Sequence, residues 1–362
     1  MNIKDSNRQL LEKTIEKIIP VSQEYISIAQ DRQNNLAKPP GSLGKLEDIS
    51  IRLAGIYRSQ FFETNPKIVI AYGADHGIYE EGISMQPQAV TALHFPNYAK
   101  GTCSIGLLSK LQGSDVLAVD IGINTDESLE GVLDRKIRKA TSNFAKGPAM
   151  THEEALQSIA AGIELADEYV KKGYRVIGLG EMGICNTSPS SAIVSVISQR
   201  DPAEVTGLGA GTPPEGLQHK VDTIRKGIEI NNPDRNDPLD ILAKVGGFEI
   251  GAITGTILGC AANSIPVVLD GFISYAGALL AKQLCPLSVQ YMMASHKSAE
   301  PASELSLEML GLSAALDMGM RLGEGSGAVL FFNLIEAANQ IYKNMMTFDS
   351  SPVPDTGIRK EK

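Results

Sequence analysis

The sequence predicts an α/β fold in which helices cover both faces of a parallel β-sheet. Short runs of apolar, largely β-branched residues alternate with longer segments of helical periodicity over most of the chain. These short runs are apolar throughout, which is typical of strands that are buried on both faces. The helical segments between them supply the crossovers that parallel strands need, and we expect these crossovers to be right-handed.

The same patterns place the individual elements. Before the first strand we expect a helix over residues 8–35 with a break at Pro20, a loop over residues 38–44 (KPPGSLG), and a helix over residues 46–57. The predicted strands cover residues 67–75, 115–122, 174–181 and 265–271. Further helices are expected over residues 90–111, 153–172, 248–262 and 328–345.

Composition limits the classes of function. The chain has 362 residues, enough for two or three structural units, and 43% of them are hydrophobic. A formal charge of −9 disfavours phosphate backbones and anionic lipid as partners, so we expect neither nucleic acid nor membrane. With no tryptophan and 5% aromatic residues, a stacking platform for single-stranded nucleic acid is also disfavoured.

Cysteine spacing and the termini favour a cytoplasmic protein. Cys103, Cys185, Cys260 and Cys285 form no CxxC pair, which indicates buried free thiols in a reducing compartment. The first ten residues contain no apolar signal core. The uncharged stretch over residues 250–269 is interrupted by glycines and a proline, so a buried helix followed by a buried strand explains it better than a membrane span.

Polar side chains follow each predicted strand. They are Asp75-His76, Asp120, Glu181 and Asp270. The carboxyl ends of parallel strands meet at one edge of a sheet, where open α/β folds bind their ligands. Each residue alone could equally be a helix cap or a turn residue, but together they mark a site.

One motif permits a dinucleotide site. GLGEMG, from Gly178 to Gly183, fits the G-x-G-x-x-G fingerprint, follows a strand and precedes Asp201 by about 20 positions. An NAD-dependent oxidoreductase is therefore one alternative. Against it, the motif lies mid-chain, Glu181 would face the pyrophosphate, and the helix is expected to begin only after CNTSPS.

Two other glycine-rich loops, GLGAGTPPEG and GEGSGA, could close backbone N–H groups around a phosphate. Lys220 would add a positive charge, and Thr187 and Ser188 would add hydroxyl donors. Close packing of the backbone is the alternative reason for these glycines. In the second loop, Glu324 is either an N-cap or first-turn acid of the last helix or a general base in a cleft. The five histidines form no HxH or HExxH motif, so no metal site is predicted.

Seven motifs in order resemble those of the nicotinate-nucleotide–dimethylbenzimidazole phosphoribosyltransferase family, which activates the lower-ligand base of cobalamin. They are KPPGSLGKLE, ADHGI, GLGEMGICNTS, KVGGFEIGAITG, PVVLDGFISY, SHKSAE and MRLGEGSGA. The resemblance implies a Rossmann-like large domain (residues 61–324), a small helical domain from both chain ends (residues 1–60 and 325–350), and a dimer. Residues 351–362 look like a flexible tail.

The resemblance also implies the site residues and requires no cofactor. Glu324 falls on the family's catalytic base, and Glu181 on the glutamate beside the ribose and the acceptor. The substrate-binding positions divide between the nucleotide phosphate and the acceptor pocket. Those matched to the phosphate region are Gly183, Asn186, Thr187, Gly209 and Lys220; those matched to the acceptor pocket are Gln86, His94 and Met182; Ser295 and Gly323, in the last two motifs, are also expected to contact substrate.

The departures from the family concern the acceptor. Its benzimidazole enzymes commonly carry serine, glutamine and leucine at the positions of Gln86, His94 and Met182. Relatives that act on phenol or p-cresol work as pairs of similar subunits. Dimethylbenzimidazole, another benzimidazole and a phenol therefore stay open as acceptors, as do a homodimer, a heterodimer and a non-catalytic role beside an active homologous subunit.

Overall fold

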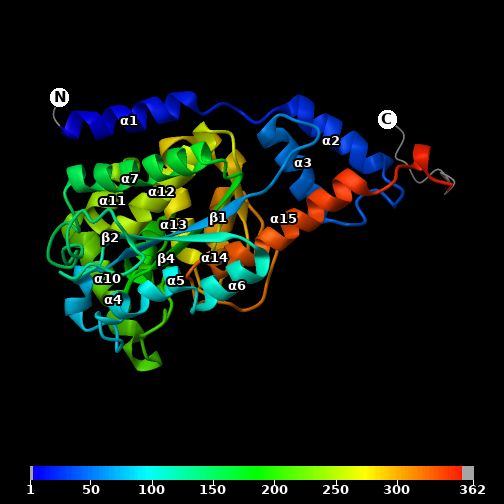
Figure 1. Ribbon diagram of the computed structural model, residues 1–362. Helices are drawn as coiled ribbons and strands as arrows, with labels where there is room; N and C mark the ends of the chain where they lie inside the picture. Colours follow the sequence, from blue (N-terminus) through cyan, green and yellow to red (C-terminus); the bar gives the residue numbers. More distant parts are fainter. Residues whose placement is uncertain (1–2, 353–362) are drawn as a thin grey trace.

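The protein is described here by a computed structural model of residues 3–352, which contain one six-stranded sheet (Figure 1). The strand order is β3-β2-β1-β4-β5-β6, and every neighbouring pair is parallel. This is the order of the doubly wound Rossmann fold, so the predicted fold class is confirmed. The strands are β1 (Lys67–Ala74), β2 (Asp115–Gly122), β3 (Leu133–Asp134), β4 (Val176–Met182), β5 (Val267–Leu269) and β6 (Met292–Ala294).

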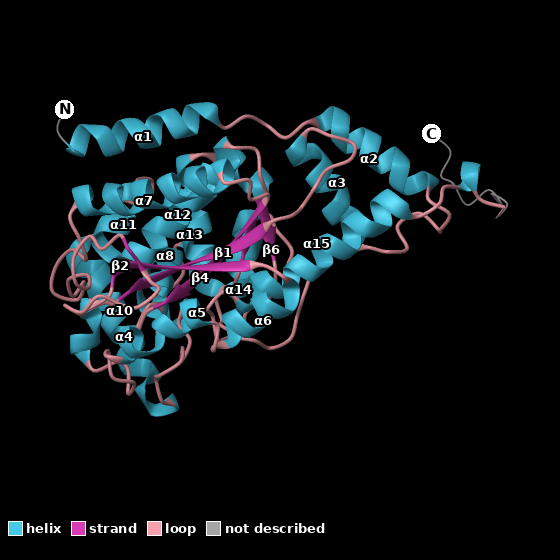
Figure 2. Cartoon of the chain, in the orientation of Figure 1, coloured by secondary structure: helices cyan, strands magenta, loops and turns pink. Residues whose placement is uncertain are grey.

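Helices pack on both faces of the sheet (Figure 2). One layer contains α7 (His152–Lys171), α8 (Thr187–Ser198), α11 (Pro238–Val245), α12 (Phe248–Ala262) and α13 (Phe272–Leu284). The other contains α5 (Pro96–Lys100), α6 (Ser104–Gln112) and α15 (Ser326–Asn344). The remaining helical segments are η1 (Gly77–Glu81), α4 (Val90–His94), α9 (Pro202–Val205), η2 (Pro214–Gly216), α10 (Leu217–Asn231), η3 (Pro286–Tyr291), α14 (Ser303–Leu310) and η4 (Phe348–Ser350).

The uncharged segment over residues 250–269 forms most of α12 and then β5, as the sequence predicts. All but the last residue of α12 are buried. The backbones of α12 and α7 lie so close at Gly255 that a Cβ there would overlap the Ile159 carbonyl oxygen. Within residues 3–352, every helix is too short or too polar to cross a membrane.

Helices from the N-terminal and C-terminal parts of the chain pack together beyond one end of the sheet. Helices α2 (Gln23–Asn35) and α3 (Lys45–Tyr57) pack together and α3 packs on α15, whereas α1 (Ile3–Lys17) lies along α7 and α12 (Figure 1). Arg32 donates from Nε to the Tyr342 carbonyl (2.7 Å) and from Nη2 to the Lys343 carbonyl (2.9 Å), which satisfies the last turn of α15. The division into two domains stays a prediction, and the predicted tail falls almost entirely outside the described residues.

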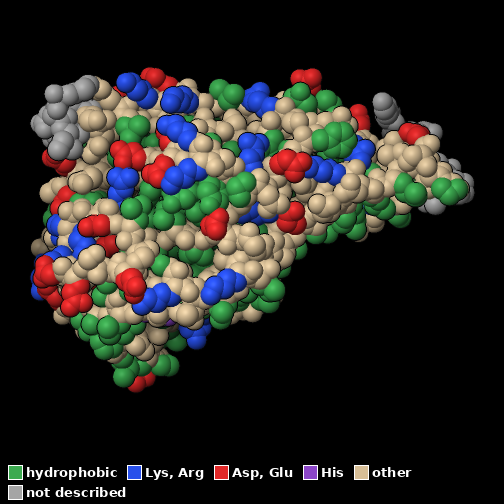
Figure 3. Space-filling model, viewed as in Figure 1, with side chains coloured by type: hydrophobic (Ala, Val, Ile, Leu, Met, Phe, Trp, Pro, Cys, Tyr) green, Lys and Arg blue, Asp and Glu red, His purple; other side chains and the backbone are tan. Residues whose placement is uncertain are grey.

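The helix expected over residues 90–111 is instead three short helices. Pro96 begins the second of them, and Gly101 ends it with a φ of +68° that an ordinary side chain would disfavour. The short helices bring His94 into contact with Glu324 and let the Tyr98 hydroxyl donate to the Glu181 carbonyl oxygen at 3.3 Å. Charged side chains of both signs are interspersed over the face shown in Figure 3.

Candidate active site

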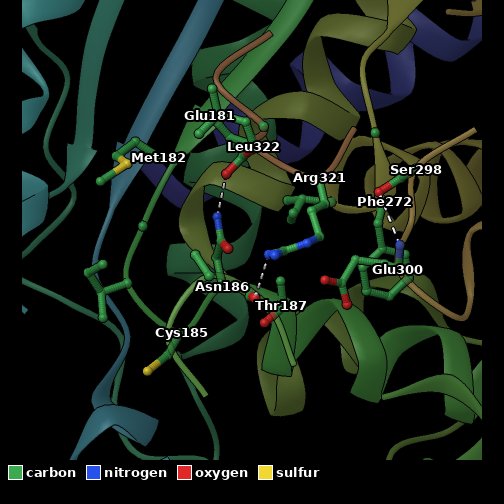
Figure 4. A pocket seen from close by; sticks show the side chains of 18 of the residues that line it. Glu181, Met182, Cys185, Asn186, Thr187, Phe272, Ser298, Glu300, Arg321 and Leu322 are labelled. Atoms are coloured by element: carbon green, nitrogen blue, oxygen red, sulfur yellow. Dashed lines mark hydrogen bonds between the residues drawn. The ribbon is translucent and has the colours of Figure 1, made fainter. Parts of the chain in front are cut away.

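A cavity lies at the carboxyl ends of β4, β5 and β6, beside the switch point of the sheet. It encloses about 950 Å³ including the open solvent at its mouth. Its walls are the segments that follow these three strands, together with the two glycine-rich loops. Figure 4 shows side chains from these segments projecting into a shared space.

Most of the predicted site residues line this cavity. They are Gln86, Glu181, Met182, Gly183, Asn186, Thr187, Gly209, Lys220 and Gly323. Three lie just outside its lining: Glu324, which adjoins Gly323; His94, which contacts Glu324; and Ser295, whose hydroxyl donates to the Asp270 carbonyl oxygen at 2.9 Å. The structure therefore brings the predicted residues together. Ser295 is buried behind Asp270, which itself lines the cavity.

Glu324 sits between two glycines in a left-handed turn, with φ of +65°. It is 5% exposed, and its Oε1 lies 3.0 Å from His94 Nε2. Its Oε2 accepts the N–H of Ile105 (3.1 Å) at the start of α6, so the carboxylate faces a helix N-terminus. It is not the N-cap of the last helix, because Gly325 holds that position. The interpretation of Glu324 as an N-cap or first-turn acid of the last helix is therefore wrong, and its role as a general base stays a proposal.

Asp270, at the end of β5, fixes this turn. Its carboxylate accepts the N–H groups of Gly325 (3.2 Å), Gly327 (2.7 Å) and Ala328 (3.2 Å), the free donors that begin α15. Burial raises the pKa of Asp270 to about 6, although the nearby His296 and these donors act in the opposite direction. The carboxylate thus offsets the unfavourable left-handed backbone at Glu324 by satisfying donors on either side of Ser326.

Glu181, at the end of β4, is the second carboxylate of the site. It is 6% exposed, Asn186 donates its side-chain N–H to Oε2, and the carboxyl group lies against the Cα of Gly323 (Figure 4). Burial and the charge of Asp270 raise the pKa of Glu181 to about 8. A carboxyl group tuned in this way is typical of a functional site.

This pKa predicts how stability depends on pH. Between about pH 4.5 and pH 8 the folded chain holds a proton on Glu181 that the unfolded chain has lost, so stability falls as pH rises through this window. Glu181→Gln keeps the contact with Asn186 but removes this titration. We expect the parent chain to lose on the order of a few kcal/mol relative to Glu181→Gln between pH 5 and pH 8. Urea unfolding at several pH values measures the difference, and parallel curves would contradict the assignment.

A cationic cluster occupies the other end of the cavity. Lys220, on α10, is 2% exposed and donates from Nζ to Thr187 Oγ1 (2.9 Å) and to the Gly207 carbonyl (2.9 Å). Burial lowers the pKa of Lys220 to about 8, although the nearby Glu300 acts in the opposite direction. Helix α8 begins at Thr187, so its N-terminus adds partial positive charge. Lysine, hydroxyl and helix N-terminus together suit a phosphate group.

The start of α8 corrects one expectation. The helix begins within CNTSPS, at Thr187, and not after it. Two buried serines near this start donate their hydroxyls to carbonyl oxygens, Ser190 to Asn186 (2.9 Å) and Ser191 to Val205 (3.0 Å), so they fit a helix despite their polarity.

The loop between β4 and α8 is held from below. Asp75 accepts hydrogen bonds from the Thr91 hydroxyl (2.7 Å) and the Asn124 N–H (2.9 Å). The Thr91 hydroxyl in turn accepts the Ile184 N–H (3.2 Å), next to Gly183 of the cavity wall. His76 Nε2 lies 3.1 Å from Glu249, and both side chains are fully enclosed. Asp75, through Thr91, and His76, which lies against Gly183, therefore help to position the loop after β4.

Sequence reasoning missed several side chains that line the cavity, among them Ser298, Glu300 and Arg321. Arg321 donates from Nη1 to the Gly209 carbonyl at 3.4 Å. All three stand within motifs already quoted, SHKSAE and MRLGEGSGA, but local spacing does not show which residues of a motif face a ligand. Among the described residues, no group of three or more His, Cys, Asp or Glu side chains is arranged to hold a metal ion.

Comparison with known proteins identifies the family. A sequence model described as phosphoribosyltransferase matches residues 18–353. The chain belongs to this family. It is 56% identical over 340 residues to the nicotinate-nucleotide–dimethylbenzimidazole phosphoribosyltransferase of Clostridioides difficile (strain 630), covering 94% of this chain and 98% of that one. The enzyme of the same name from Alkaliphilus metalliredigens (strain QYMF) is 46% identical, over 95% and 99% of the two chains.

A solved structure agrees with the family assignment. The protein CobT from Thermus thermophilus superimposes with a TM-score of 0.87 at 36% identity, covering 92% of this chain and 99% of the other. The resemblance drawn from the seven motifs is therefore confirmed, and the protein is a phosphoribosyltransferase. The alternative of an NAD-dependent oxidoreductase receives no support from the family.

Proposed function

We propose that this phosphoribosyltransferase moves ribose 5-phosphate from nicotinate mononucleotide to an aromatic lower-ligand base, for assembly of the nucleotide loop of a cobamide. One observation carries the proposal. The cavity is lined by Lys220, which is hydrogen-bonded to Thr187 at the start of α8, and by Glu181; Glu324 adjoins the lining residue Gly323. The printed names of the relatives support nicotinate mononucleotide and dimethylbenzimidazole as the substrates.

The leaving group needs no general acid. The departing nicotinate ring is positively charged and becomes neutral as its bond to C1′ breaks, so it needs no proton. The ribosyl carbon gains positive character, and a carboxylate beside it stabilises that charge. Glu181 suits this role because a cationic ring nearby favours its ionised form.

The acceptor, by contrast, must lose a proton. Glu324 is the proposed general base: its carboxylate is ionisable, nearly buried, and held by the Ile105 N–H and by His94. Donor and acceptor would lie on opposite faces of the ribose, so that proximity lowers the barrier and C1′ is inverted from β to α.

Three side chains bear on which acceptor is used. Gln86 and Met182 line the cavity, and His94 lies outside the lining, where it contacts Glu324. Replacing a leucine by the flexible thioether of Met182 and changing the polar groups beside it alters an apolar pocket only modestly. Such changes shift acceptor preference about 10–200-fold.

A competition assay tests the proposal and identifies the acceptor. The purified chain is incubated with nicotinate mononucleotide, mixed benzimidazoles and mixed phenols, and the riboside products are identified by mass. We expect one product class to dominate. If riboside forms only after a homologous subunit is added, the chain is a supporting partner. If none forms under either condition, the proposed substrates are wrong. We also propose that the protein is located in the cytoplasm and forms either a homodimer or a heterodimer with a homologous subunit.

A further inference from the structure

Glu300 is a cavity-lining residue that the mechanism above does not use. It follows β6 in the turn that leads to α14, and this turn is fixed at several points. Ser298 Oγ accepts the Glu300 N–H (3.4 Å), Ser303 Oγ accepts the Ser298 N–H (3.0 Å), and the Met320 carbonyl accepts the Ala299 N–H (3.0 Å). The backbone that carries Glu300 is therefore held in place before any ligand arrives.

The Glu300 carboxylate is not satisfied by the protein. The residue is 7% exposed, and its Oε2 is buried without a hydrogen-bond partner anywhere in residues 3–352. A buried acceptor of this kind is costly to leave unpaired. The carboxylate lies directly against Gly207, where any side chain would overlap Oε2. The carbonyl of the same residue, Gly207, accepts a hydrogen bond from Lys220. The Glu300 carboxylate and the Lys220 ammonium group therefore both contact Gly207.

The proposed donor has few groups that Glu300 can bind. A carboxylate needs an O–H or N–H partner. The phosphate dianion and the nicotinate carboxylate of nicotinate mononucleotide offer acceptors only, whereas the ribose carries the 2′ and 3′ hydroxyls. These hydroxyls lie within a few bonds of the phosphate, as Glu300 lies close to the Lys220 cluster (Figure 4).

We propose that Glu300 accepts hydrogen bonds from the ribose hydroxyls of the nucleotide donor, and so makes the site selective for ribonucleotides over deoxyribonucleotides. This assignment rests on the proposed function. Glu300 selects the donor by its sugar, while Lys220 holds the phosphate and Glu324 serves the acceptor.

Equilibrium binding without an acceptor tests this assignment. Calorimetry with nicotinate mononucleotide and its 2′-deoxy and 3′-deoxy forms is carried out on the parent chain, Glu300→Gln and Glu300→Ala. We expect the parent chain to bind at least one deoxy form about 10- to 100-fold more weakly, the range for a hydrogen bond to a charged group. Glu300→Ala should bind all three within about twofold, and Glu300→Gln should fall between. Glu304→Gln, which removes an exposed charge four residues further along, in the first turn of α14, is the matched control and should keep the parent's preference.

The outcomes separate the two proposals. Equal binding of all three nucleotides by the parent chain, or a full preference retained in Glu300→Ala, overturns the role of Glu300 and leaves the proposed function standing. Failure of the parent chain to bind any of the three overturns the proposed function and this assignment with it. If Glu300→Ala does not fold, Glu300→Gln decides: an unchanged preference in that variant also overturns the role.

Discussion

Glu324→Gln is expected to fold like the parent chain and to lose at least about 100-fold in turnover, the scale of a lost general base. Glutamine has the same shape, and its side-chain oxygen still accepts the Ile105 N–H, so the turn and the start of α6 are preserved. It cannot take up a proton from the acceptor. Because Lys220 and Glu324 share no hydrogen-bond partner among the described residues, KM for the nucleotide should change little.

Initial rates at saturating nucleotide, together with thermal unfolding, measure this effect. The control is Glu308→Gln, which removes an equal charge from an exposed position on α14. It should match the parent chain in both measurements. Turnover of Glu324→Gln within a few-fold of the parent would remove Glu324 from the mechanism.

Lys220→Met should instead weaken the binding of the nucleotide. Two of the three ammonium protons are donated to Thr187 and Gly207, which leaves one for a ligand phosphate. Loss of a charge-assisted hydrogen bond corresponds to a rise of about 10- to 100-fold in KM for the nucleotide. Methionine fills a similar volume, so α10 should keep its packing.

Steady-state kinetics over a range of nucleotide concentrations separate KM from kcat. Lys226→Met, on the same helix but half exposed, is the matched control and should leave KM unchanged. An unaltered KM in Lys220→Met would mean that the phosphate binds elsewhere.

The strands of the sheet were predictable because burial on both faces demands apolar residues at every position. The ends of β1, β2 and β4 fall within two residues of the expected positions. The strands β3 and β6 escaped prediction, since β3 has two residues and β6 consists of Met292, Met293 and Ala294, none of them β-branched. Helix α8 was misplaced because six of its twelve residues are Ser or Thr, which local propensity assigns to caps and turns.

The site was predictable where a motif carries its own chemistry. Glu181 and Glu324 stand among glycines, a setting that sequence alone marks as unusual. The parts that depend on distant segments meeting were not predictable. Asp270 reaches the start of α15 across 55 residues, and Glu300 meets Gly207 only in the folded chain. Ser295 donates a hydrogen bond to the Asp270 carbonyl oxygen. Its contact with substrate stays a prediction.

The most direct test of the whole account is to follow both products of one reaction. The parent chain is mixed with nicotinate mononucleotide and dimethylbenzimidazole, free nicotinate is quantified, and the anomeric configuration of any riboside is read by NMR. The account predicts nicotinate and α-riboside 5-phosphate in equal amounts. Nicotinate released without riboside, or a riboside of retained β configuration, would contradict in-line transfer to a deprotonated acceptor.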